Sequence, residues 1–151
     1  LEKMNYKPKM ILAGRKINDN MSKYVAKKIL KNLKLINLKK KKILILGATF
    51  KENCSDLRNS KIFDTIKFLE KKGIKVYLFD PLVPIEELKS FTGNIVKKLD
   101  RKNFYDAAVI SVKHEEFIKL GIKKIRQNIK NKGLIFDLKS TFPNNQTDWH
   151  L

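Results

Sequence analysis

The sequence predicts an α/β fold, a Rossmann-like doubly wound parallel sheet preceded by a long N-terminal helix. Short apolar runs typical of buried strands alternate along the chain with segments that carry apolar residues at helical spacing. Polar loops follow the strands, as they do at the ligand-binding edge of such a sheet. With 151 residues and 42% hydrophobic content, the chain can fold as one domain with a core and a helical extension.

The N-terminal part predicts a link followed by a long helix. Residues 1 to about 14 are typical of the end of a larger region, and Pro8 enforces an extended backbone there. The helix that follows is predicted from apolar residues that fall close to one face, namely Ile17, Met21, Val25, Ile29 and Leu33. The lysine run 39–42 ends this segment.

Strands and helices then alternate. Apolar runs predict strands at 43–46, 75–79, 107–112 and 133–137, and periodic or Pro-initiated segments predict helices at 60–72, 84–91 and 115–128. Ser60, or Asn59 in competition with it, is the expected N-cap of the first of these helices, and Gly73 is its expected stop. The polar tail 141–151 is expected to lie across the surface, with Trp149 as an anchor against the body or a dimer partner.

The formal net charge of +19 invites a nucleic-acid interpretation. Nearly all of the excess is lysine spread over every segment, and no aromatic-interleaved basic motif, zinc-ligand set or recognition helix is visible. We therefore expect no specific nucleic-acid binding and a positive field that attracts an anionic small molecule such as a nucleotide. A basic α/β module that binds RNA or another anionic partner is the alternative.

Other chemistry-bearing features are sparse. The single Cys54, the lack of a signal-peptide layout and the lack of a membrane-length apolar run favour a cytoplasmic protein without membrane attachment. No metal site is expected. Cys54 has no histidine near it in sequence and is interpreted as a small packing residue. His114 follows a strand end, where a packing or surface role is favoured over ligand contact.

One loop carries a family resemblance. The segment 47–60, which begins at Gly47 and ends at Ser60, reads GATFKENCSDLRNS and resembles the G-x-x-F-K-x-(N/D)-x-x-D-x-R-x-S motif of the UDP-glucose/GDP-mannose dehydrogenase family, in its C-terminal UDP-binding domain. Asp80-Pro81 is similar to the family's Y-D-P element, with Phe79 in place of tyrosine. The segment 12–19 and the ending 148–151 resemble the UDP-N-acetylhexosamine 6-dehydrogenase branch.

The resemblance implies the last third of an NAD-dependent UDP-sugar 6-dehydrogenase of capsule or O-antigen polysaccharide biosynthesis. It implies that residues 1–40 end a central helical dimerisation region and that 41–151 form the UDP-sugar-binding domain. The family's catalytic cysteine precedes the segment with which this chain opens, so the chain alone is expected to be inactive and to contain no catalytic residue. NAD is expected to bind mainly to an N-terminal domain, and a homodimer is expected to form through the N-terminal helix.

The resemblance also assigns site residues. Phe50 and Lys51 match positions that bind the substrate, and a lysine at a strand end offers charge and donors to a diphosphate or a sugar hydroxyl. Lys139 matches a position where relatives carry an arginine that binds UDP; lysine keeps the charge but loses the bidentate fork. Arg58 matches an arginine directed at NAD, with an ion pair to Asp56 as the plainer interpretation. Asp56 is expected to hold the loop through backbone N–H groups.

Overall fold

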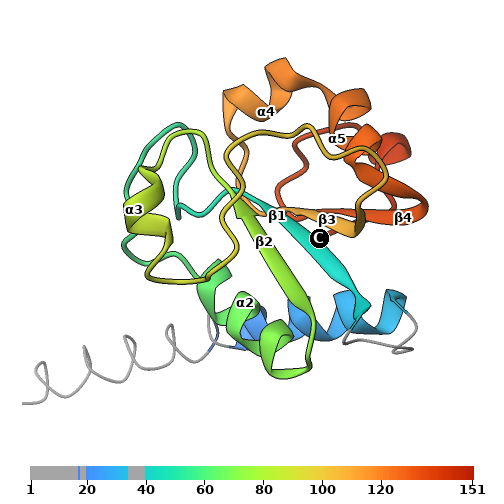
Figure 1. Cartoon of the computed structure of the whole chain (residues 1–151). Helices are drawn as coiled ribbons and strands as arrows, with labels where there is room; N and C mark the ends of the chain where they lie inside the picture. The colour runs from blue at the N-terminus through green and yellow to red at the C-terminus, as the bar shows by residue number, and fades with distance from the viewer. Residues whose placement is uncertain (1–16, 18–19, 34–39) are drawn as a thin grey trace, which may run out of the picture.

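The computed structural model describes residues 17, 20–33 and 40–151, and its centre is a parallel sheet of five strands in the order β2-β1-β3-β4-β5. The strands are β1 (Lys42–Leu46), β2 (Lys75–Phe79), β3 (Tyr105–Ile110), β4 (Ile129–Asp137) and β5 (Trp149–His150). The helices are an N-terminal helix (20–32), α2 (Ile62–Lys71), α3 (Ile85–Leu88), α4 (Glu115–Leu120), α5 (Ile122–Asn128) and the short 3-10 helix η2 (Asn144–Gln146). The predicted α/β doubly wound fold is confirmed (Figure 1).

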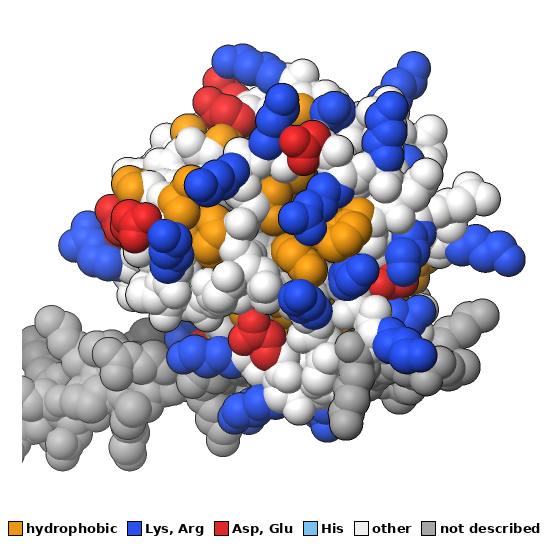
Figure 2. Space-filling view, in the orientation of Figure 1, with side chains coloured by type: hydrophobic (Ala, Val, Ile, Leu, Met, Phe, Trp, Pro, Cys, Tyr) orange, Lys and Arg blue, Asp and Glu red, His pale blue; other side chains and the backbone are white. Residues whose placement is uncertain are grey.

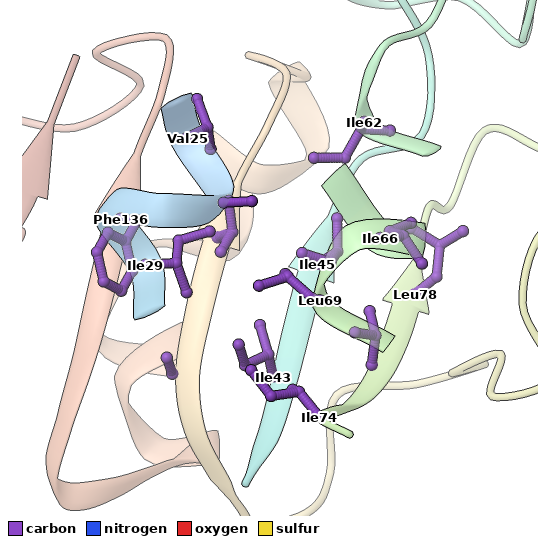
Figure 3. Packing of buried hydrophobic residues seen from close by; sticks show 14 of the residues in the cluster. Val25, Ile29, Ile43, Ile45, Ile62, Ile66, Leu69, Ile74, Leu78 and Phe136 are labelled. Atoms are coloured by element: carbon purple, nitrogen blue, oxygen red, sulfur yellow. The ribbon is translucent and has the colours of Figure 1, made fainter. Parts of the chain in front are cut away.

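Helices cover both faces of the sheet. The N-terminal helix and α2 lie on one face, and α4 and α5 lie on the other (Figure 1). Each central strand alternates its side chains between two buried clusters, so that Ile43 and Ile45 face α2 whereas Leu44 and Leu46 face α4 and α5. On the first face, Figure 3 shows Val25 and Ile29 of the N-terminal helix close to Phe136 of β4.

The N-terminal helix is confirmed, but its buried face differs from the prediction. Val25, Ile29 and Leu33 are buried as expected, whereas Ile17 is 64% and Met21 is 44% exposed. A spacing of four residues drifts around a helix of 3.6 residues per turn, so the first two residues of the series rotate away from the sheet. The expectations for residues 1–14 and for the lysine run at position 39 lie outside the described residues.

The predicted strands at 43–46 and 75–79 are confirmed, and the other two are displaced: β3 ends at Ile110, and β4 begins at Ile129. The predicted helix at 115–128 is two helices, because Gly121 adopts φ 83° between them. The tail, which was expected to lie across the surface, is largely exposed or half-buried, and it also extends the sheet. Its residues Trp149 and His150 add β5 to the sheet, parallel to β4.

The ends of α2 test the predicted caps. Gly73 has φ 87° and its N–H bonds to the carbonyl of Glu70, so the predicted stop is confirmed. The N-cap prediction is wrong: the N-cap is Lys61, one residue after Ser60, and it forms no side-chain cap. Asn59 adopts φ 62°, a turn conformation that asparagine tolerates.

Tyr105 gives a first test of the packing. It is 1% exposed in the cluster under α4 and α5, and its hydroxyl has no hydrogen-bond partner among the described residues. Because a buried hydroxyl without a partner is costly, we expect Tyr105→Phe to raise the free energy of unfolding by about 1 kcal/mol in urea titration. Tyr24→Phe, at a tyrosine that is 47% exposed, is the matched control and should change nothing.

The same residue predicts a pH dependence. Burial raises the pKa of Tyr105 above its ordinary value of 10.0, so its phenol stays protonated to a higher pH in the folded state than in the unfolded chain. The stability of the folded state that comes from this difference is complete below pH 10 and is lost as the pH rises through the raised pKa. Stability measured between about pH 9 and about pH 11.5 should therefore fall more steeply for the wild type than for Tyr105→Phe. Parallel curves would contradict this prediction.

Candidate functional site

The site is built where the strand order reverses. The chain leaves β1 for β2 on one side and later returns to place β3 on the other side of β1. In a doubly wound sheet of this order, ligands bind beside the carboxyl ends of the two strands that flank the reversal. Here those ends carry the loop 47–60 after β1 and the segment 111–114 after β3, with Asp80 after β2 alongside them.

Gly47 ties these strand ends together. Its N–H bonds to the carbonyl of Phe79 over 2.9 Å, and its own carbonyl accepts the Ser111 hydroxyl over 2.6 Å. The backbone adopts φ 100°, and a Cβ at this position would overlap Val112 Cγ1. Only glycine therefore lets the chain turn so closely past the end of β3.

A cavity of about 180 Å³ lies at this edge of the sheet. It brings two of the predicted substrate residues, Phe50 and Lys139, to one place. The other lining residues come from the N-terminal helix, the β1 loop, the start of α2, the loops after β3 and β4, and the end of the chain: Met21, Ser22, Val25, Thr49, Ser60, Lys61, Ile62, Thr65, Ser111, Leu138 and Leu151. Phe50 is 56% exposed, so its ring is available to a ligand.

Lys139 follows β4 in a turn shaped by a buried carboxylate. Asp137 is fully buried, and its two oxygens accept the N–H groups of Lys139 over 3.3 Å and of Phe142 over 2.9 Å. Ser140 adopts φ 50° within this turn. The turn leaves the Lys139 side chain exposed at the rim of the cavity, where its charge can meet an anion.

The structure does not place the other two predicted residues in this cavity. Lys51 is exposed, and its main-chain carbonyl accepts the Thr49 hydroxyl over 2.7 Å and the Cys54 thiol over 3.2 Å. Cys54 is half-buried in this contact, which agrees with its interpretation as a packing residue.

Arg58, the second of these residues, forms an ion pair with Asp56, which is the alternative to NAD binding that the sequence offers. Its Nη2 lies 2.9 Å and its Nε 3.0 Å from the carboxylate, and its backbone N–H bonds to the same group over 2.9 Å. These bonds from Arg58 hold the pKa of Asp56 below its ordinary value. The Arg58 side chain is 86% exposed and its direction is fixed by the ion pair, so it is accessible to a group outside the loop.

His114 is the feature that sequence reasoning underestimates. It is fully buried, and its Nε2 lies 3.1 Å from Asp80 Oδ2 and 3.4 Å from the Thr49 hydroxyl, while its Nδ1 accepts the Asn53 N–H over 2.9 Å. The interpretation of His114 as a packing residue is confirmed in its burial, but the hydrogen bonds are additional. These partners are 34 to 65 residues away in sequence, so no local sequence motif predicts the hydrogen bonds.

The tail closes one side of the cavity. The Asp148 carboxylate accepts the Ile135 N–H over 2.7 Å and an Arg126 N–H over 3.1 Å, which fixes the start of β5. Trp149 packs against the core, with its ring 6.0 Å from that of Phe136. The expected anchoring against the body is thus observed, and β5 brings Leu151 to the cavity lining.

The rest of the described surface offers fewer features of a binding or catalytic site. A wider depression of about 540 Å³ lies at the edge strand β2, lined by Lys75, Lys97, Lys98 and Arg101, away from the carboxyl ends of the strands. Figure 2 shows Lys and Arg side chains scattered over the visible face instead of gathered in one patch. Within the described part of the chain, no group of three or more His, Cys, Asp or Glu is arranged for a metal ion, and no helix is long and apolar enough to cross a membrane.

Comparison with known proteins places this geometry in a family. A model of the UDP-glucose/GDP-mannose dehydrogenase family, UDP binding domain, matches residues 44–144. A UDP-N-acetyl-D-glucosamine 6-dehydrogenase of Salmonella typhi is 42% identical over 150 residues, which are 98% of this chain and 35% of that protein. A protein of the same name from Pseudomonas aeruginosa is 34% identical over 152 residues, 99% of this chain and 36% of that protein.

A solved structure agrees with these matches. The native structure of the UDP-N-acetyl-mannosamine dehydrogenase Cap5O from Staphylococcus aureus aligns with a TM-score of 0.72 at 25% identity, over 94% of this chain and 33% of that one. This chain therefore spans about a third of the length of the relatives that it matches. Since the family match covers well over half of its residues, the chain belongs to the UDP-glucose/GDP-mannose dehydrogenase family and carries its UDP binding domain.

Proposed function

We propose that this chain is the nucleotide-sugar-binding part of an NAD-dependent UDP-sugar 6-dehydrogenase, and that the cavity between Phe50 and Lys139 receives the UDP moiety. The observation that carries this proposal is the position of the cavity. It lies at the strand reversal, most of its lining belongs to the segment 44–144 matched by the UDP binding domain, and it combines an exposed aromatic ring with a cation. The ring suits the uracil or ribose face, and the ammonium suits the diphosphate.

The remaining roles extend this proposal. Lys51 lies in the same loop as Phe50, outside the cavity, and we assign it to the sugar or the diphosphate at the rim. Arg58, held by Asp56, is directed at NAD carried by another part of the protein. The branch that oxidises UDP-N-acetylhexosamines is favoured because the first relatives carry such names, and capsule synthesis is the pathway that the name "Protein CapL" of a Staphylococcus aureus relative suggests. Homodimerisation through the N-terminal helix belongs to the same proposal.

Calorimetric titration of the chain with UDP tests the binding role. We expect selective binding, with UDP preferred over inorganic phosphate, and a loss of about tenfold in affinity for Lys139→Ala and for Phe50→Ala. Lys67→Ala removes the same charge from the exposed surface of α2 and is the matched control. Equal affinities for UDP and phosphate, or an equal loss in the control, would contradict the proposed site. Tight RNA binding with a steep salt dependence would instead favour the basic-module alternative.

A further inference from the structure

We infer that His114 is a positioning residue of the UDP site: its ring fixes the Thr49–Asn53 turn and thereby sets where Phe50 stands at the cavity. The inference rests on the proposed function of that cavity. It concerns a residue that is fully buried and therefore cannot touch the ligand itself.

The hydrogen bonds determine the state of the ring. Because the Asn53 backbone N–H donates to Nδ1 over 2.9 Å, Nδ1 must present its lone pair, and the ring proton lies on Nε2. Nε2 then donates to Asp80 Oδ2 over 3.1 Å. Asp80 is held in turn by the N–H groups of Ala48 and Leu82, over 2.8 and 2.9 Å. The carboxylate thus selects the tautomer that can accept from the turn.

The turn depends on these bonds at both of its ends. Asn53 adopts φ 57°, a turn conformation that asparagine tolerates, and both its backbone N–H and its side-chain oxygen are hydrogen-bonded. Its N–H meets His114, and its side-chain oxygen accepts the Glu115 N–H over 2.8 Å. At the other end the Thr49 hydroxyl donates to the Lys51 carbonyl and lies 3.4 Å from His114 Nε2.

Phe50 lies between these two fixed ends. Its ring is 56% exposed, so burial of its own side chain contributes little to its position. The turn sets the direction of the ring, and the turn is attached to the body through His114. The groups that face the imidazole are Asp80 from the turn after β2, Thr49 and Asn53 from the β1 loop, and Phe117 of α4, whose ring lies 5.3 Å away. Asp80 is the charged group in this set.

Two substitutions test the roles of the two ring nitrogens of His114 one at a time. The His114→Asn side chain places an oxygen near the site of Nδ1 and keeps an acceptor for the Asn53 N–H, whereas that of His114→Gln reaches the site of Nε2 and keeps a donor for Asp80. We expect His114→Gln to weaken UDP binding about tenfold and His114→Asn to stay within about threefold of the wild type. Ile125→Val is the control: it lowers the free energy of unfolding through the cluster under α4 and α5, away from the cavity lining, and should leave UDP affinity unchanged.

Hydrogen exchange of the Asn53 amide, followed by NMR, distinguishes the two proposals. We expect slow exchange in the wild type, in His114→Asn and in Ile125→Val, and exchange about tenfold faster in His114→Gln. If the wild type binds no UDP, the proposed function fails and His114 has no role in UDP binding; the exchange pattern then still shows whether His114 fixes the Asn53 turn. If His114→Gln bound UDP with wild-type affinity and its Asn53 amide exchanged as slowly as in the wild type, the inference about His114 would be overturned.

Discussion

Gly47→Ala is expected to lower the free energy of unfolding by about 3 to 5 kcal/mol and to abolish UDP binding. Two costs add at this position. The backbone has φ 100°, which an alanine tolerates poorly, and the new Cβ would overlap Val112 Cγ1 while lying 3.2 Å from the Ser111 hydroxyl. Val112 is 2% exposed and packed in the core, so it cannot move aside cheaply. Urea unfolding and UDP titration measure the two effects.

Two other glycines separate these costs. Gly121 has φ 83°, and a Cβ added there would meet no non-neighbouring atom of the described residues within 4 Å, so Gly121→Ala should show the backbone cost alone, about 1 to 2 kcal/mol. Gly93 has no positive φ, and an added Cβ would likewise meet nothing within 4 Å in the described part of the chain, so Gly93→Ala should change stability by less than about 0.5 kcal/mol. Adding Val112→Ala to Gly47→Ala should relieve the overlap. Equal losses at Gly47 and Gly121 would show that the contact with Val112 does not matter.

The elements that sequence analysis locates correctly are those specified by local signals. The strand at 43–46 is a continuous apolar run, and Gly73 ends α2 because its own backbone adopts φ 87°. The strand β5 has no such signal. It contains two residues, and it forms because Asp148 accepts bonds from Ile135 and from Arg126, whose positions depend on the tertiary fold.

In the candidate site, too, the residues with a local sequence signal can be predicted, whereas the contacts between distant residues cannot. The family resemblance predicts Phe50 and Lys139 as substrate-binding residues, and the cavity that both of them line is visible only in three dimensions. Asp80 and His114 are recognisable in sequence as strand-end residues, but their bond crosses 34 positions and depends on the order of the strands. The break at Gly121 escapes sequence analysis because the apolar spacing of 115–128 continues across it.

Asp80→Ala is expected to cost about 3 to 5 kcal/mol of unfolding free energy, because one buried carboxylate serves three donors. Its Oδ2 accepts the Ala48 N–H and His114 Nε2, and its Oδ1 accepts the Leu82 N–H, while the residue is 5% exposed. Removal leaves the buried donors of Ala48 and His114, and the partly buried donor of Leu82, without their acceptor. The loss of the Nε2 partner also frees the His114 tautomer, so UDP affinity should fall together with stability.

Asp64→Ala is the matched control, since it removes a carboxylate from the exposed surface of α2, where the nearest cation, Lys61, is 3.8 Å away. Its cost should stay below about 1 kcal/mol, with UDP affinity unchanged. Asp80→Asn keeps one acceptor oxygen but turns an amide N–H₂ toward donors, so it should fall between the wild type and Asp80→Ala in guanidinium titration. If Asp80→Ala were no more costly than Asp64→Ala, the buried carboxylate could not be what joins the turn after β2 to the β1 loop.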